Sequence, residues 1–297
     1  MNKILSSPRI TSGSAKGLID KVKNREIFNP NSKIVWEPPK DEYIDVFFES
    51  MSGNMLHAWL FDLYDDRPII LYCHGNFGNI TYRQKFVELA KILRCNIFMF
   101  DYSGYGESEG EPSLINLRLD SLSAYQYVEQ YYHPHDIFIF GKSLGGYSAL
   151  TIASEYPDIM GVIVCSTFST FDMVIEDTSI KSKIYRFLIK MCTSEVPSNR
   201  ELIKKTSRNN TRVSIMHSVD DSFIPYRNGI DLKKNCGVTC SFVEIQGDHA
   251  SPTISLDEFL KSLDFIDFPF ESRDYQFIQE LSDWLYSLPE IHKLLDI

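Results

Sequence analysis

A glycine-rich turn around a serine is the strongest chemical signal in this sequence. Gly141-Lys142-Ser143-Leu144-Gly145 follows the apolar run Asp136–Phe140 and precedes a segment with helical periodicity. Between a strand and a helix, the two glycines permit a tight, strained turn that raises a nucleophilic serine above a sheet edge. The N-terminus of the following helix also favours negative charge that develops at this serine. We therefore predict Ser143 to be the nucleophile of a hydrolytic site.

A base must accept the proton of such a serine, because a hydroxyl is a poor nucleophile near neutral pH. Where the nucleophile occupies this kind of turn, the chain order is serine, then acid, then histidine. His249 follows the last predicted strand in a glycine-containing loop, which is the expected place for the base. His217 ends an apolar run and is interpreted as a strand residue, and His133 and His135 precede the nucleophile's strand. His249 is the predicted base.

An acid that orients the base is expected after the strand that ends near Ser218. Two adjacent aspartates, Asp220 and Asp221, occupy that loop, so the residue pattern leaves two candidates. Asp248 is a poor candidate, because adjacent side chains rarely form the required bond between carboxylate and imidazole.

The tetrahedral oxyanion of an acyl-transfer reaction needs backbone donors that are already in place. The N–H of Leu144 is the first predicted donor, because this residue directly follows the nucleophile. The second is expected from the loop Cys73–Asn79, in which Asn76 and Phe77 are both candidates and Phe77 is favoured. His74 is interpreted as a brace of this loop rather than as a base.

The elements that must position these residues have an α/β pattern. Continuous apolar runs, typical of strands buried on both faces, alternate with segments of helical periodicity. This alternation predicts a mostly parallel, doubly wound sheet. Residues 43–50 and 54–61 surround a turn containing Gly53 and predict an N-terminal antiparallel hairpin. The predicted parallel strands cover residues 68–73, 96–100, 136–140, 160–165, 212–216 and 240–245.

Three regions follow from this pattern. Residues 1–42 are polar and punctuated by prolines, and they predict an irregular lead-in. Residues 43–297 form the predicted catalytic domain. The interval 167–211 is too long for a single crossover and predicts a small helical cap over the edge where ligands bind. Its apolar side chains are candidates for an acyl pocket, although core packing of the cap is favoured: Phe168, Phe171, Ile184, Tyr185, Phe187 and Leu188.

Composition excludes several classes of protein. The 297 residues are 43% apolar and have a net charge of −10, which disfavours nucleic-acid binding. No run of about 18 apolar residues exists, so we expect no transmembrane segment. The six scattered cysteines are better explained as buried thiols than as a disulfide framework, which favours a reducing, cytoplasmic location. No glycine fingerprint or metal-ligand spacing is present, so we predict neither cofactor nor metal.

Together these residues resemble the α/β-hydrolase superfamily, in particular the branch of BEM46-like proteins and depalmitoylating thioesterases. The resemblance rests on the stretches 74–79, 100–110, 141–146 and 221–225 and on His249, which occur in the expected order. The spacing from Asp221 to Pro225 matches the D-x-x-I-P pattern of this family, and therefore favours Asp221 over Asp220 as the acid. Asp101 in the second stretch is expected to accept backbone hydrogen bonds.

The resemblance implies the α/β-hydrolase fold and a serine hydrolase that cleaves a carboxylic ester or thioester through an acyl-enzyme. The expected partner is a small-molecule or lipid-like acyl substrate. The alternative is a catalytically silent protein that uses the same fold for binding or as a scaffold. Two departures from the family concern substrate rather than chemistry: Ser103 replaces a usual arginine, and Ser218 a common glycine. The lead-in also lacks the membrane span or acylated cysteines of several relatives. Substrate identity, acyl-chain length and oligomeric state do not follow from the sequence.

Overall fold

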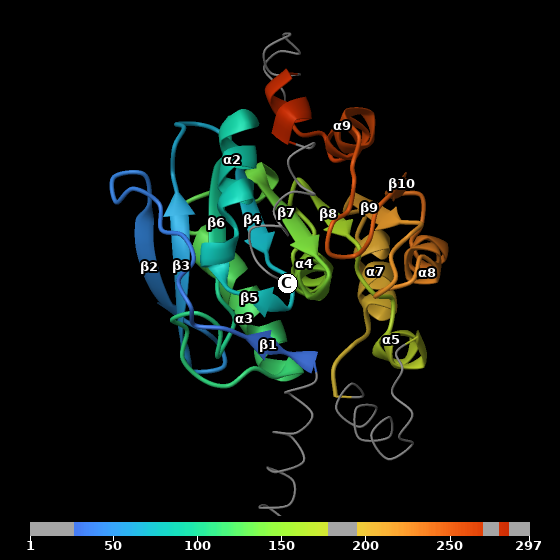
Figure 1. Ribbon diagram of the computed structural model, residues 1–297, viewed down its shortest axis with the longest axis horizontal. Helices are drawn as coiled ribbons and strands as arrows, with labels where there is room; N and C mark the ends of the chain where they lie inside the picture. The colour runs from blue at the N-terminus through green and yellow to red at the C-terminus, as the bar shows by residue number, and fades with distance from the viewer. Residues whose placement is uncertain (1–26, 178–194, 270–278, 285–297) are drawn as a thin grey trace, which may run out of the picture.

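The fold is built around one large sheet, seen in a computed structural model that describes residues 27–177, 195–269 and 279–284 (Figure 1). The strands are β1 (Asn29–Pro30), β2 (Ile44–Glu49), β3 (Met55–Phe61), β4 (Ile69–Cys73), β5 (Phe77–Gly78), β6 (Asn96–Phe100), β7 (Ile137–Lys142), β8 (Gly161–Cys165), β9 (Val213–Ser218) and β10 (Cys240–Ile245). Eight of them form the sheet in the order β10-β9-β8-β7-β4-β6-β3-β2. The short strands β1 and β5 pair separately.

The direction of the strands explains where the site forms. Strand β3 runs antiparallel to both β2 and β6, so the predicted N-terminal hairpin is present. The six neighbouring strands β6, β4, β7, β8, β9 and β10 run parallel to one another. Strands β4 and β7 are buried along nearly their whole length, as their continuous apolar sequences require. Because parallel strands end at one edge, the loops after β4, β7, β9 and β10 all meet there.

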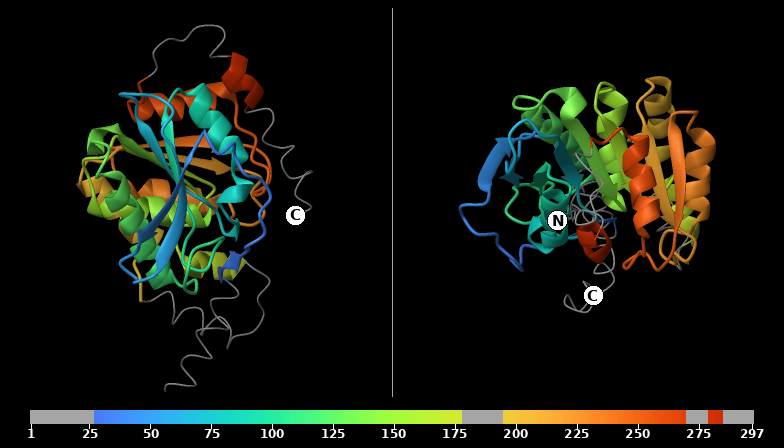
Figure 2. Two further views of the ribbon diagram at one scale, coloured as in Figure 1. Left: turned by 90° about the vertical axis from the view of Figure 1, so that its left-hand side faces the viewer. Right: turned by 90° about the horizontal axis from the view of Figure 1, so that it is seen from above.

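Helices cover both faces of the sheet, as Figure 2 shows. They are α2 (Gln84–Ile92), α3 (Leu114–Val128), α4 (Leu144–Glu155), α5 (Phe171–Asp177), α7 (Asn199–Arg208), α8 (Arg227–Asn235) and α9 (Leu256–Phe265), with 3-10 turns at Ile80–Tyr82 and Pro134–Asp136. Buried side chains of α3, α4 and α7, among them Leu117, Leu150 and Leu202, belong to one core. Val87 of α2 and Phe259 of α9 belong to the core on the opposite face.

Part of the expected cap lies elsewhere. Helix α7, which the sequence analysis assigned to the cap at 167–211, packs against α4 and α8 in the layer beside the sheet. Its apolar face explains this position, because Leu202 and Ile203 are buried in the core shared with α4. Residues 178–194, which also belong to the predicted cap, lie outside the described residues.

The cysteines follow the expectation in part. Cys73, Cys95 and Cys165 are buried free thiols, as predicted. Cys236 and Cys240, however, form a disulfide, contrary to the prediction that the chain has none. The turn between α8 and β10 brings their Cα atoms to 5.9 Å, a separation that a disulfide spans readily. Cys192 lies outside the described residues.

The described part of the lead-in is attached to the domain. Residues 27–42 are mostly irregular, but β1 pairs in parallel with β5, with Asn29 opposite Phe77. Phe28 is buried in the core and Trp36 packs edge-on against Trp59. The segment therefore lies against the loop that the sequence analysis assigns to the oxyanion.

Among the residues with described positions, no helix combines the length and the apolar character needed to cross a lipid bilayer.

Candidate active site

Ser143 lies at the turn between β7 and α4. Its backbone has φ 55° and ψ −118°, a conformation that is costly for a residue with a side chain. The Ser143 N–H donates to the Cys165 carbonyl at 2.9 Å, and the Thr167 hydroxyl donates to the Ser143 carbonyl at 2.7 Å. These bonds from β8 and its following loop hold the strained turn in place.

The glycines around Ser143 are required by close packing. A Cβ on Gly145 would overlap the carbonyl oxygen of Cys73, and one on Gly141 would overlap the backbone of Gly145. The turn can therefore pass this close to the end of β4 only with glycine at both positions. This packing places Ser143 next to the loop that follows β4.

Three predicted residues are joined by hydrogen bonds in the structure. The Oγ of Ser143 lies 3.0 Å from Nε2 of His249, and Nδ1 of His249 lies 2.8 Å from Oδ2 of Asp221. Ser143 and Asp221 are buried, whereas the His249 side chain is 16% exposed. An ionised Asp221 accepts the Nδ1 proton, so the Nε2 of a neutral His249 is left as an acceptor toward Ser143.

The loop after β9 orients Asp221 toward His249. Its other carboxylate oxygen, Oδ1, accepts hydrogen bonds from the N–H groups of Phe223 and Ile224 at 3.0 and 2.7 Å. The neighbouring Asp220 is exposed and accepts instead from the N–H of Gly247. Asp248 accepts from the N–H and hydroxyl of Ser222. Of these three carboxylates, only Asp221 is hydrogen-bonded to the His249 imidazole.

Two residues of β9 support these loops. The buried imidazole of His217 lies 2.8 Å from the Ile224 carbonyl through its Nε2, and burial lowers its pKa. The hydroxyl of Ser218, which replaces the common glycine, donates to the Gly247 carbonyl. The acid loop and the histidine loop are thereby joined directly.

The loop after β4 is tied to the lead-in. The side-chain oxygen of Asn76 accepts hydrogen bonds from the N–H of Asn29 and the hydroxyl of Tyr105, both at 2.8 Å. Asn79 donates to the carbonyls of Asn31 and Lys33 at 2.7 and 3.1 Å. These bonds fix the loop that contains both candidate oxyanion donors. The N–H of Leu144 lies at the first turn of α4, where helix geometry provides no intrahelical acceptor.

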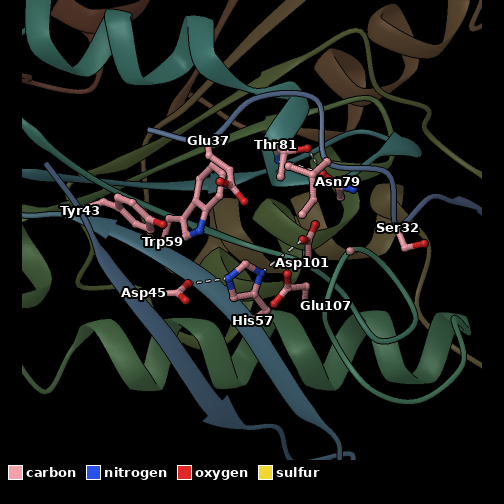
Figure 3. A pocket seen from close by; sticks show the side chains of 12 residues that line it. Ser32, Glu37, Tyr43, Asp45, His57, Trp59, Asn79, Thr81, Asp101 and Glu107 are labelled. Atoms are coloured by element: carbon pink, nitrogen blue, oxygen red, sulfur yellow. Dashed lines mark hydrogen bonds and ion pairs between the residues drawn. The ribbon is translucent and has the colours of Figure 1, made fainter. Parts of the chain in front are cut away.

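A cluster of polar side chains adjoins this loop, and Figure 3 shows three of its members: Asp101 and His57, which are buried, and Asp45, whose side chain is exposed. Asp101 accepts from the N–H of Ile80 at 2.9 Å, and it also lies 3.4 Å from Nε2 of the buried His74. His57 lies between two carboxylates, 2.7 Å from Asp45 and 3.9 Å from Asp101. His74 is thus placed among structural groups of the loop and not beside Ser143.

A cavity of about 570 Å³ opens beside Ser143 and His249. Among the described residues, its walls come from the loop after β4, from α2 and from the segments that follow β10, and the described residues of the expected cap do not line it. Phe168 and Phe171 are buried in the core and do not line it. Ile184, Tyr185, Phe187 and Leu188 lie outside the described residues. The sequence analysis missed the apolar side chains that line the cavity, such as Phe86 and Trp284, because they look like ordinary core.

Within the part of the chain that the structure describes, no group of three or more His, Cys, Asp or Glu residues has the arrangement of a metal site.

Comparison with known proteins places this geometry in a class. A family model described as alpha/beta hydrolase fold matches residues 68–185. An esterase from Pyrococcus furiosus superposes with a TM-score of 0.61 at 16% sequence identity, over 90% of this chain and 98% of the esterase. The protein therefore has the α/β-hydrolase fold.

Curated relatives match over shorter stretches. The protein YfhR of Salmonella typhi is 31% identical over 175 residues, which are 53% of this chain and 60% of YfhR. Human alpha/beta hydrolase domain-containing protein 17C is 30% identical over 173 residues, 57% of this chain and 49% of the human protein. The chain thus spans about half to three-fifths of these relatives. The family model, these relatives and the superposed esterase agree on the fold, and the chain is similar to proteins of the α/β-hydrolase superfamily.

Proposed function

We propose that the protein is a serine hydrolase that cleaves a carboxylic ester or thioester through an acyl-enzyme. The observation that carries the proposal is the continuous hydrogen-bonded series from Ser143 through His249 to Asp221, with separations of 3.0 and 2.8 Å. These distances are within the range over which a base removes a proton from its nucleophile.

The proposed reaction uses each residue in turn. Nε2 of His249 accepts the Ser143 proton as Oγ attacks the acyl carbonyl, and the same proton then passes to the leaving group. Asp221 stabilises the imidazolium that forms. Water then attacks the acyl-enzyme with His249 again as base, which regenerates the free hydroxyl of Ser143.

The developing oxyanion is proposed to bind two backbone N–H groups. Leu144 supplies one at the start of α4, and Phe77 supplies the other, with Asn76 as the alternative. Both candidates line the cavity beside Ser143, which supports the assignment of this loop. A single such donor contributes about 10²- to 10³-fold to kcat.

Labelling with a fluorophosphonate probe tests the nucleophile. We expect the folded protein to be labelled on one serine, and Ser143→Ala to abolish labelling and reduce ester turnover by at least about 10⁴-fold. Heat-denatured protein provides the control for dependence on the folded site, and circular dichroism checks that the variant is folded. Undiminished labelling of folded Ser143→Ala would overturn the assignment. Absence of labelling in the wild type would favour the alternative of a silent binding protein.

Three further expectations from the sequence stay predictions. They are a cytoplasmic location, a small-molecule or lipid-like acyl substrate, and no binding of nucleic acid by a chain with net charge −10.

A further inference from the structure

The cavity beside Ser143 has a wall made of aromatic side chains. Tyr72 and Phe140 come from the adjacent strands β4 and β7, where they are paired in register. Phe86 of α2 packs on them, with ring-centre separations of 4.0 Å to Tyr72 and 5.4 Å to Phe140. All three lie on the sheet face covered by α2 and α9. The cavity therefore extends from the nucleophile along this face.

Two C-terminal aromatic residues close the wall. The ring of Trp284 lies 6.2 Å from Phe86 and 6.1 Å from Phe259 of α9. Its Nε1 donates to the Lys85 carbonyl at 2.6 Å, and the side chain is 5% exposed. The indole is thus anchored to α2 at one fixed orientation.

The Lys and Arg side chains that line the cavity each have a protein partner, and Lys85 of α2 pairs with Glu88 at 2.7 Å. Lys142, next to Ser143, donates to the Ala250 carbonyl at 3.4 Å, and burial lowers the pKa of its ammonium group. Arg83 donates to the Phe77 carbonyl. The rings farther along the wall present apolar surface, so this part of the cavity favours an apolar occupant.

The volume of the cavity indicates the size of the molecule that it can hold. A ligand cavity of about 570 Å³ is within the range that encloses a drug-sized molecule, whereas about 150 Å³ suffices for benzene. An acetyl group would leave most of it unfilled. Each methylene group transferred from water to such a wall favours binding by about fourfold.

We propose that this cavity binds the acyl chain of the substrate, and that Trp284 and Ile254 limit the chain length. The proposal rests on the proposed hydrolase function and adds a substrate class: esters or thioesters of unbranched, apolar acyl chains well beyond acetyl. The carbonyl lies at Ser143, and the alkyl chain follows Phe140 and Phe86 toward Trp284. Continuity of the cavity with Ser143 and His249 is the reason for choosing this occupant.

A series of p-nitrophenyl esters from acetate to laurate tests the proposal. We expect kcat/KM of the wild type to rise by about fourfold per methylene over the first several groups and then to level off. A wild type that cleaves acetate best, with a steady fall for longer chains, would overturn the assignment of the cavity.

Two variants with opposite expectations identify the limiting residues. Trp284→Ala enlarges the cavity, and we expect it to raise the ratio of laurate to acetate kcat/KM by roughly tenfold. Ile254→Phe fills the cavity, and we expect it to lower this ratio by roughly tenfold. Phe265→Ala is the matched control, because this aromatic residue of α9 does not line the cavity. If folded Trp284→Ala and Ile254→Phe both keep the wild-type ratio, the proposal is wrong.

Fluorophosphonate labelling separates failure of the cavity assignment from failure of the proposed function. Protein that labels and cleaves acetate, but has a chain-length profile unaffected by either variant, remains a hydrolase with its acyl site elsewhere. Protein that neither labels nor cleaves any ester contradicts both proposals. Thermal unfolding of each variant checks that the comparison is made on folded protein, and Ile254→Phe keeps the test decisive if Trp284→Ala does not fold.

Discussion

At the scale of single residues, the two adjacent aspartates receive different environments from the same loop. Asp221 is buried, accepts hydrogen bonds from two backbone N–H groups and is hydrogen-bonded to His249. Asp220 is exposed. Backbone donors and the imidazole together hold one carboxylate in a single orientation. We infer that only this carboxylate can orient the base.

Paired substitutions of these aspartates give a direct comparison. We expect Asp221→Asn to lower kcat by about 10⁴-fold, because an amide does not stabilise the imidazolium and favours the wrong tautomer. Asp220→Asn is the matched control and is expected to stay within about threefold of wild type, because its exposed side chain accepts a hydrogen bond from the Gly247 N–H and not from His249. Steady-state ester hydrolysis measures both, and a larger loss in Asp220→Asn would reverse the assignment.

His57 makes stability depend on pH. Burial alone lowers its pKa, but the carboxylates of Asp101 and Asp45 outweigh this effect and raise it above the ordinary value. The folded state then binds the proton more tightly than the unfolded state does. Protonated His57 therefore contributes stability that is complete below about pH 6.5 and is lost as pH rises through the folded pKa.

Urea unfolding of His57→Gln checks the sign of this dependence. We expect the variant to be less stable than the wild type by a larger margin at pH 6 than at pH 9, because glutamine carries no proton to be bound. Comparison at two pH values removes the pH-independent cost of the substitution. A margin that is constant or grows with pH would show that the pKa of His57 is not raised.

Some residues of the site could be found in the sequence, and others could not. Ser143 and His249 were identifiable because a glycine turn and a loop after the last strand have distinctive residue types. Trp284 and Phe86 carry no such mark. They line the cavity only because their face of the sheet lies beside Ser143. That arrangement depends on the packing of Trp284 against Phe86 and Lys85, which are 198 and 199 positions away along the chain.

At the scale of elements, the lead-in strand β1 is part of the site's support. The Tyr105 hydroxyl joins it to the proposed oxyanion loop, since it accepts from the Asn29 N–H at 3.2 Å and donates to Asn76 at 2.8 Å. The loop is therefore held from both sides before substrate binds. Such preorganisation is what an oxyanion site requires.

Removing this hydroxyl tests the support. We expect Tyr105→Phe to lower kcat by about fivefold with little change in KM, which corresponds to one hydrogen bond of roughly 1 kcal/mol. Tyr131→Phe is the control, because Tyr131 is 65% exposed and lies in the turn after α3. An unchanged kcat in Tyr105→Phe would mean that β1 does not influence the proposed oxyanion donors.

Elements were predictable where local pattern and final position agree. The buried strands followed from continuous apolar runs and the hairpin from two extended runs around a turn containing Gly53, and both are present. Helix α7 was misplaced in a cap because its amphipathic pattern shows that one face is buried but not which surface covers it. The pairing of β1 with β5 was missed because two-residue strands leave no periodicity to detect.

At the scale of the whole molecule, the two faces of the sheet have different relations to the site. The face covered by α3, α4 and α7 carries a large core of buried side chains. The face covered by α2 and α9 contains the cavity where β4 and β7 pass beneath Phe86. Ser143 lies where β7 ends, so its side chain borders this second face.

The hydrogen bond from Trp284 to Lys85 connects positions 199 residues apart. Trp284, which we propose to limit the length of the acyl chain, is therefore encoded far from the residues of α2 that it packs against. The proposed catalytic groups lie between Asn76 and His249, whereas Trp284 lies beyond them. Mutations in residues 279–284 can therefore alter which acyl chains fit while the loops that carry Ser143, Asp221 and His249 stay the same. Related genes could diversify in substrate through this short region without repeating the evolution of the catalytic site.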